Sequence, residues 1–258
     1  MLYYFFNNLK KKLIKGLASK GGRNKKGRIC IRGRGKGNKT LYRYIDFYKR
    51  LNQFGKLLHF FYDTNRSSKI VLILYNNGLC CYSILQKNVK VNSYIYSGTF
   101  FNYKKIKVTN GFSLPLNLMP LFSILSNIEL LPFQGSKLVR AAGLSSILIS
   151  KDITNAYLKL NSGWTYKLNN LCISTLGTNS NRLYNNEIIR KGGKNRGLGF
   201  KSKVRGVAKN PCDHPHGGGN GKRAKPCQPV NAWNTVFKWK PTNSKLYYKL
   251  KKRKFKAI

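Results

Sequence analysis

Acidic residues are scarce in this chain: only six of its 258 residues are Asp or Glu, against 50 Lys and Arg. The formal net charge is +44 at pH 7, which would cause strong self-repulsion in a free globular protein. A solvated surface normally mixes charges of both signs, so a surface of this kind needs a polyanionic partner. The charge therefore predicts a nucleic acid as the partner, with an anionic membrane surface as the lesser alternative.

The shortage of carboxylates also argues against catalysis. A two-metal nuclease needs several carboxylates at one site, and here none of the six clusters with another in the sequence. Asp213, with His214 and His216, is the one group that a metal nuclease or a general base would use. We therefore predict no enzymatic activity and no catalytic residue.

The six cysteines show neither a disulfide framework nor a Cys-x-x-Cys pair. A reducing compartment with six free thiols is the simplest interpretation. We predict no bound metal and no cofactor, except that Mg²⁺ shared with an RNA remains an option. One set of zinc ligand types stands close together, at spacings that match no common zinc pattern: Cys212, His214, His216 and Cys227.

Long hydrophobic runs are absent, so we expect no membrane-spanning segment. The most apolar stretch, residues 114–131, is interrupted by Pro115 and Pro120. The apolar residues 1–6 precede the first lysines, the reverse of a secretory signal, and no Arg precedes Arg23, unlike a usual mitochondrial presequence. Lys outnumbers Arg 36 to 14, and abundant Asn, Tyr, Phe and Ile also have A+T-rich codons. This bias indicates an A+T-rich genome, such as an organelle's, and we favour the mitochondrial matrix over a plastid.

The apolar residues concentrate between about Leu41 and Ile189, and they suffice for one or two small cores. Asn76-Asn77-Gly78 is a hairpin signal between two apolar runs. Short strands without a convincing helix predict a small barrel over residues 39–110. The expected strands are 41–47, 59–62, 69–75, 79–85 and 93–101.

A second small antiparallel barrel is predicted over residues 111–188. We expect residues 112–132 to be irregular because of their prolines. Trp164 and Tyr166 would serve either as RNA-stacking platforms or as packing residues. The expected strands are 146–150, 156–160, 164–168 and 171–175.

The two ends of the chain are basic and rich in glycine. Residues 1–38 and 189–258 contain too few apolar residues to form a core, so we predict extended arms that order on RNA. Leu9, Leu13 and Leu17 recur every four residues, which fits either a short basic helix or a frayed terminal segment.

The most specific segment is NPCDHPHGGGNG at residues 210–221. Pro211 and Pro215 remove backbone donors and fix φ, while the glycines allow backbone paths closed to other residues. Such a segment is neither a helix nor a core strand. Its bare backbone can approach another molecule closely, and the surrounding Lys and Arg make that molecule a polyanion.

This signature closely resembles that of the universal large-subunit ribosomal protein two family, in its bacterial or organellar form. Further matches to the same family occur in order along the chain and cover roughly residues 20–240. They are GGRN at 21–24, GRICIRGRGKGNKTLYRYIDF at 27–47, YDTNRSSKIVLI at 62–73, SKLVRAAG at 136–143 and STLG at 174–177.

The resemblance implies an OB-like barrel followed by an SH3-like barrel, with both termini extended and basic. It implies a structural component of the large ribosomal subunit that binds rRNA near the peptidyl transferase centre and supports subunit association. Neighbouring ribosomal proteins, and the small subunit, are expected further contacts, whereas a membrane is not. Cys212 departs from the family by replacing an aliphatic residue, and Asn220 by replacing an acid; the tail after Gly221 is also diverged.

The family's conserved functional position falls on Asp213 and His214, with His216 and the glycines shaping the loop. Arginines elsewhere can grip phosphates bidentately or stack on bases. The full set of candidate RNA-binding residues is Arg23, Arg28, Arg32, Arg34, Lys36, Lys39, Arg43, Arg66, Arg140, Arg196, Lys203, Arg205, Asn210, Asp213, His214, His216, Gly217, Gly218, Gly219, Lys222 and Arg223.

Overall fold

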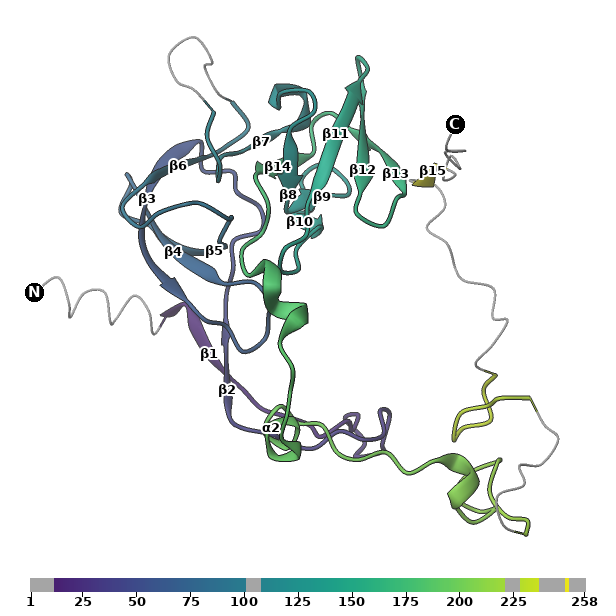
Figure 1. Cartoon of the computed structure of the whole chain (residues 1–258). Coiled ribbons are helices and arrows are strands. Elements are labelled where there is room, and N and C mark those ends of the chain that lie inside the picture. Colours follow the sequence, from purple (N-terminus) through teal and green to yellow (C-terminus); the bar gives the residue numbers. More distant parts are fainter. Residues whose placement is uncertain (1–11, 101–107, 221–227, 237–248, 251–258) are drawn as a thin grey trace, which may run out of the picture. The chain divides into compact units, whose positions relative to one another are not determined.

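The computed structural model describes residues 12–100, 108–220, 228–236 and 249–250 (Figure 1). The chain divides into two compact units. We call residues 1–17, 40–188 and 246–258 the β unit, and residues 18–39 and 189–245 the basic unit. In the described part of the chain, no helix is long and apolar enough to cross a membrane.

The first half of the β unit is a set of antiparallel strands in the order β6-β3-β4-β5 (Figure 1). A separate two-stranded sheet, β1-β2, precedes it. A parallel bridge between Ile45 and Tyr82 brings the chain that follows β2 alongside β5. The strands are β1 (Ile14–Leu17), β2 (Thr40–Arg43), β3 (Gln53–Phe61), β4 (Ile70–Tyr75), β5 (Cys80–Ile84) and β6 (Tyr94–Ser97).

The second half continues the same sheet in the order β15-β13-β12-β11-β8-β14-β7. A parallel pairing of Ser97 with Ser113 joins β6 to β7 and so connects the two halves. Its elements are β7 (Ser113–Pro115), η1 (Leu116–Leu118), β8 (Ile124–Ser126), β9 (Ile128–Glu129), β10 (Ser136–Leu138), β11 (Ser146–Lys151), β12 (Asn155–Leu160), β13 (Thr165–Asn169), β14 (Ile173–Leu176) and β15 (Lys249–Leu250).

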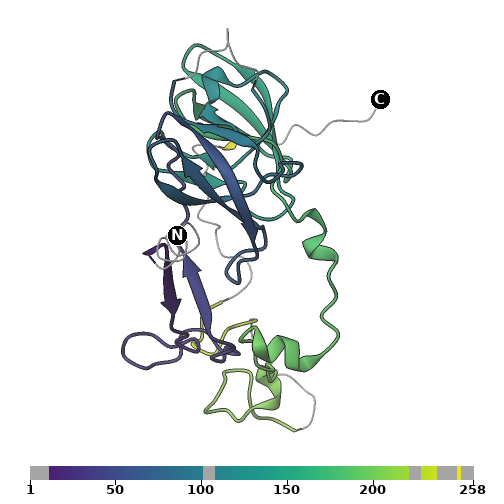
Figure 2. The ribbon, with the colours of Figure 1, turned by 90° about the vertical axis from the view of Figure 1, so that its left-hand side faces the viewer.

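The prediction of a mainly β fold is confirmed, and the strand order agrees with an OB-like barrel followed by an SH3-like barrel. Figure 2 shows the strands of the β unit from the side. Short 3₁₀ turns occur at η2 (Arg182–Asn186) and η3 (Gly206–Ala208), and a six-residue helix, α2, spans Gly192–Gly197. α2 lies in a stretch that we predicted as loop. Its three glycines make it a weak helix former, so the sequence carries no helix signal there.

Two further differences concern short strands. Residues 112–132 are not irregular throughout, because they contain β7, β8 and β9. These strands are only two or three residues long, too short for a periodic pattern. The alternative of a basic helix over residues 9–17 is wrong for residues 14–17, which form β1 and pair with β2. Leu13 and Ile14 pack against a core cluster, which favours the strand over the helix.

Two hydrophobic clusters hold the β unit together, and β4 contributes to both. Val71 and Ile73 face the larger cluster, which also contains Leu114 and Leu158 from the second half. Ile70, on the opposite face, belongs to the smaller one. Burial on both faces explains why β4 is a continuous apolar run rather than an alternating one.

Lys49 is a buried cation between the two halves. It is 4% exposed, and its Nζ donates to Thr175 Oγ1 at 2.7 Å and to Ser113 Oγ at 3.1 Å. Burial lowers the pKa of Lys49 from 10.5 to about 8, with the negative charge of Asp46 opposing the shift. Lys49 is therefore a structural residue rather than an RNA contact.

We expect Lys49→Met to stabilise the protein at pH 7 by about 1–3 kcal/mol, because a cation no longer has to be desolvated. The pKa of Lys49 is lower in the folded chain, so between pH 8 and 10.5 the unfolded chain holds more protons. The stability of the parent therefore rises with pH across this window, and the advantage of the variant shrinks. Urea unfolding of both proteins at pH 7 and pH 10 measures this, and an equal difference at both pH values would contradict it.

Candidate RNA interface

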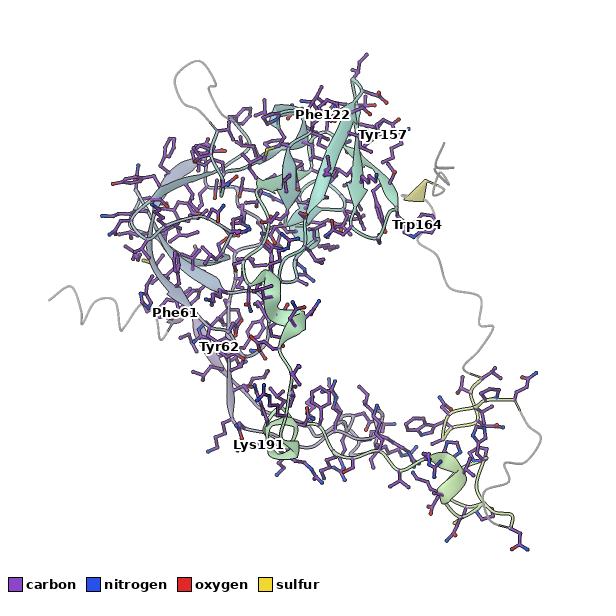
Figure 3. The ribbon with its side chains drawn as sticks, viewed as in Figure 1. Phe61, Tyr62, Phe122, Tyr157, Trp164 and Lys191 are labelled. Carbon is purple, nitrogen blue, oxygen red and sulfur yellow. The ribbon has the colours of Figure 1, made fainter. Side chains whose placement is uncertain are left out.

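Half of the net charge of the chain, +22 of +44, lies in the basic unit, which is less than a third of the chain. Nine Lys and Arg occur in residues 18–39 and fourteen in residues 189–245, against one carboxylate, Asp213. Within the described part of this unit, no side chain forms an ion pair. Neither hydrophobic cluster includes a residue of this unit. Lys191, immediately before α2, is one of its many exposed cations (Figure 3).

The two basic segments pair with each other although about 160 residues separate them in sequence. Gly35 N donates to Gly199 O at 2.8 Å, Asn38 N to Gly197 O at 2.9 Å, and Lys201 N to Gly33 O at 2.9 Å. The prediction of two independent arms missed this pairing, which depends on backbone atoms and leaves no side-chain pattern. In the basic unit, two chain segments are therefore held together by backbone hydrogen bonds, and their charged side chains surround this pairing.

Glycine is required at one point of this pairing. Gly37 has φ +67°, and a Cβ there would lie 2.8 Å from the carbonyl oxygen of Gly197 and 2.9 Å from the nitrogen of Gly199. Any side chain would force the two segments apart. The glycines of this unit thus permit backbone contact within the protein, besides the close approach to RNA that we predicted from the sequence.

Two of the candidate arginines stack on aromatic rings of the same unit. The guanidinium of Arg34 lies 4.3 Å from the ring centroid of Phe200, and that of Arg32 lies 5.6 Å from the ring of Trp233. These contacts restrain planar, fully charged groups that can pair bidentately with phosphate. Sequence reasoning missed Phe200 and Trp233, since isolated aromatic residues in a basic segment show no periodicity.

The signature loop is a folded turn held by its own backbone. Asn210 O accepts hydrogen bonds from Asp213 N at 3.0 Å and from His214 N at 3.3 Å. Gly217 N donates to His214 O at 2.8 Å, and Gly218 N donates to Lys209 O at 3.0 Å. The loop therefore presents Asp213 and the two histidines from a closed turn.

Three glycines make this turn possible, because a side chain at any of them would collide with a neighbouring group. A Cβ at Gly217 would lie 2.3 Å from Asn210 O, and one at Gly218, whose φ is +81°, would lie 2.6 Å from Pro211 Cγ. A Cβ at Gly206 would lie 2.6 Å from the His214 ring. Gly217 and Gly218 are among the residues predicted from the sequence, whereas Gly206 is not, because it lies outside the signature.

His214 is a neutral hydrogen-bonding group. Its Nδ1 accepts from His216 N at 3.0 Å, which places the proton on Nε2. Partial desolvation, then His216 and the charges of Lys209 and Arg32, lowers the pKa of His214 below its ordinary value. In the described part of the chain, Nε2 has no hydrogen-bond partner. One N–H donor is thus available for an external acceptor.

His216 connects the loop to the segment that follows the signature. Its Nε2 lies 3.2 Å from Val230 N and 3.3 Å from Gln228 O. The ring accepts from Val230 in one tautomer and donates to Gln228 in the other, so it satisfies one of them at a time. The rings of His214 and His216 lie 4.8 Å apart. His216 therefore fixes the loop, as the resemblance implies.

No group of three His, Cys, Asp or Glu in the described part of the chain is placed to hold a metal ion. Of the zinc ligand types that we considered, Cys212 is exposed and has a free thiol, and Cys227 lies outside the described residues, as do Lys222 and Arg223.

The candidate arginines of the β unit are in different situations. Arg66 Nε lies 3.0 Å from Asp63 Oδ2, and Arg43 Nη1 lies 3.5 Å from Asp63 Oδ1. The Asp63 side chain is fully buried, so both guanidiniums are held inside the protein. Arg140 instead stacks on Phe47 at 5.0 Å and is exposed. Of these three, Arg140 is the one with an exposed side chain.

The two aromatic residues that we considered as stacking platforms are partly buried within the β unit. Tyr166 packs against the larger hydrophobic cluster. Trp164 is half-buried beside the β12–β13 turn (Figure 3). The remaining candidates have exposed side chains in the basic unit: Arg23, Arg28, Lys36, Lys39, Arg196, Lys203, Arg205, Asn210 and Asp213.

Comparisons with known proteins agree on one family. The family model "Ribosomal Proteins L2, RNA binding N-terminal domain" matches residues 10–97, and "Ribosomal Proteins L2, C-terminal domain" matches residues 109–234. "Large ribosomal subunit protein uL2" of Orientia tsutsugamushi is 40% identical over 90% of this chain and 84% of its own length. The proteins of the same description from Brucella ovis and Phenylobacterium zucineum are each 38% identical, over 91% and 90% of this chain and 83% and 82% of theirs. The chain belongs to the ribosomal protein L2 family, in its bacterial type.

Proposed function

We propose that this protein is a structural constituent of the large ribosomal subunit and binds its rRNA. One observation carries this conclusion: a basic unit with 23 cations and one carboxylate is attached to a β unit with its own core. A free protein has nothing to balance such a unit, whereas rRNA supplies a phosphate at every nucleotide. The family membership makes that RNA the large-subunit rRNA.

The two units have different roles, one in stability and the other in RNA binding. The β unit supplies a stable body, since its hydrophobic clusters offset the entropy of ordering the chain. Among the described residues of the basic unit there is no such cluster, so its ordering depends on backbone pairing, counterion release and hydrogen bonds to RNA. Exposed arginines grip phosphates, and the signature loop fits where a bulkier backbone would clash.

Co-sedimentation tests the proposal directly. An epitope-tagged chain is expected to migrate with large subunits through a gradient at a salt concentration that strips loosely attached basic proteins. A chain that leaves the particle under those conditions, or that sediments with DNA, would be a different nucleic-acid-binding protein. The same gradients from purified organelles test our assignment to the mitochondrial ribosome, for which the composition of an A+T-rich genome and the diverged tail after Gly221 are the support.

The finer placement follows from the family signature. We infer that the signature loop lies in rRNA near the peptidyl transferase centre as a structural wedge, and that the protein supports subunit association. Neighbouring ribosomal proteins and the small subunit are further expected contacts. Any Mg²⁺ would be shared with rRNA, because Asp213 is the loop's one carboxylate and a lone carboxylate is a poor cation site.

His214→Gln tests the structural role of the loop. Gln keeps an N–H donor and a carbonyl acceptor but does not titrate near neutrality, and His214 is already neutral. We therefore expect normal assembly and a peptide-bond-forming rate within about tenfold of the parent, the size of one hydrogen bond. The measurement is the rate of a single peptidyl transfer on purified particles.

His59→Gln is the matched control, because His59 is an exposed histidine on β3 of the β unit. It should leave both assembly and rate unchanged. Normal assembly of the His214→Gln particle together with a far larger loss of rate would show that the imidazole takes part in proton transfer.

A further inference from the structure

The β unit contains a cavity of about 540 Å³, away from the signature loop in sequence. It lies among the segment that follows β5, the start of β8 and the turn that follows β14. The volume falls within the range of about 300–1,000 Å³ that is typical of small-molecule sites. The family signature and the arginine clusters do not include it.

The polar lining of the cavity is cationic and rich in carboxamides. Lys87 and Arg182 supply the charge, and Asn88, Asn110 and Asn161 supply amide groups. No carboxylate lines it, and neither cation forms an ion pair within the part of the chain that the structure describes. This composition suits a ligand with one anionic group and several donors and acceptors.

The walls are fixed by backbone hydrogen bonds. Lys87 N donates to Thr178 O at 2.7 Å, Gly177 N to Ile124 O at 2.8 Å, and Gly143 N to Ser180 O at 3.2 Å. These bonds tie the three segments together around the space. The cavity is therefore preformed, which lowers the entropic cost of binding.

Gly143 brings Arg182 to the cavity. Its φ is +65°, and a Cβ there would lie 2.8 Å from the Cα of Arg182. Only glycine allows this approach of the two backbones. The position of Arg182 thus depends on the glycine at position 143.

We propose that this cavity binds one unstacked nucleotide of the rRNA. Lys87 and Arg182 bind its phosphate, the Asn side chains hydrogen-bond the edge of its base, and Ile124 contacts the base face. Unstacked bases in loops and bulges are the usual targets of specific RNA recognition. The inference rests on the proposed function, since it takes the ligand to be rRNA.

A nucleotide fits the lining better than an acidic peptide does. A carboxylate only accepts hydrogen bonds, so a site for acidic side chains would consist of donors. Each Asn amide both donates and accepts, as the edge of a nucleobase does. Three of them around one space therefore favour a base.

Site-resolved NMR of the full chain tests the proposal, in enough KCl to suppress non-specific anion binding. The probes are the four ribonucleoside 5′-monophosphates, ribose 5-phosphate, inorganic phosphate and an Asp-rich peptide. We expect saturable shifts of the Gly143, Gly177 and Thr178 amides with at least one monophosphate, at lower concentration than with the other probes. An equal response to ribose 5-phosphate, a stronger response to the peptide, or no response would overturn the proposal.

Lys87→Ala and Arg182→Ala should each weaken nucleotide binding about tenfold, the effect of losing one charged hydrogen bond. Lys167→Ala, an exposed lysine of β13 outside the cavity, is the matched control and should bind as the parent does. Arg182→Lys keeps the positive charge and should therefore keep most of the nucleotide binding. Binding that is lost in Arg182→Ala but kept in Arg182→Lys is due to the charge and not to misfolding. If Lys87→Ala and Lys167→Ala weakened binding equally, the effect would be general electrostatics and the site would be refuted.

Chemical probing of assembled particles supplies the second measurement. One rRNA base that is protected in parent particles should become reactive in Lys87→Ala particles of normal composition. Unchanged protection would refute the site but leave the proposed function intact. Failure to co-sediment with large subunits would refute the proposed function while leaving the NMR result standing.

Discussion

The affinity of the purified chain for its rRNA fragment is expected to fall about 10³–10⁵-fold when salt rises from about 50 mM to 200 mM. Each Lys or Arg that neutralises a phosphate releases condensed counterions, and added salt reverses that gain. The basic unit alone offers 23 cations, none of them ion-paired in the described part of the chain. Filter binding or fluorescence anisotropy across a salt series measures the slope.

Single substitutions can distinguish exposed cations from cations that are already hydrogen-bonded within the protein. Lys36→Ala removes an exposed cation of the basic unit and should reduce the slope of log affinity against log salt by about one. Lys151→Ala is the matched control in the β unit, because Lys151 Nζ donates to Asn117 O at 2.9 Å and to Met119 O at 2.8 Å. It should leave the slope unchanged. A shallow slope for the parent would mean that the charge does not meet phosphates.

The structural features that could be predicted from the sequence are those that produce a pattern of side-chain types along the chain. The apolar run of β4 and the Asn76-Asn77-Gly78 turn predicted the β4–β5 hairpin, and the register of Leu74 with Cys80 agrees. The pairing of residues 33–38 with 197–201 left no such pattern. Two glycine-rich segments that meet through backbone atoms look, in sequence, like two separate arms.

The charge of a residue does not show whether its side chain is exposed, and this also limited what the sequence could predict. Charge pointed to the two basic ends of the chain, but it gave the same weight to every arginine. Arg43 and Arg66 lie within a matched motif and resemble RNA contacts until Asp63 is found between them. Asp63 is three residues from Arg66 and twenty from Arg43, and no local rule predicts that one carboxylate is buried against both.

Asp63→Ala is expected to lower the free energy of unfolding by about 3–5 kcal/mol. The side chain of Asp63 is fully buried, and its removal leaves two guanidiniums, 16% and 18% exposed, without their counter-charge. It also removes an acceptor for Asn65 N, at 3.3 Å. Arg66 also lies over the rings of Tyr42 and Phe47, at 5.8 and 5.6 Å from the centroids, but such contacts contribute only about 0.5–1 kcal/mol each and do not replace the lost counter-charge.

Asp152→Ala is the matched control for this loss. Asp152 is exposed and its carboxylate accepts one hydrogen bond, from Tyr157 Oη at 2.9 Å, so removal of the carboxylate should cost about 1 kcal/mol or less. Urea unfolding of both variants, followed by circular dichroism, compares them on the same chain. Because Arg43 and Arg66 are released in Asp63→Ala, RNA binding of the folded fraction should not weaken. Equal stability losses in the two variants would show that Asp63 is an ordinary surface carboxylate, and that Arg43 and Arg66 were free to bind RNA from the start.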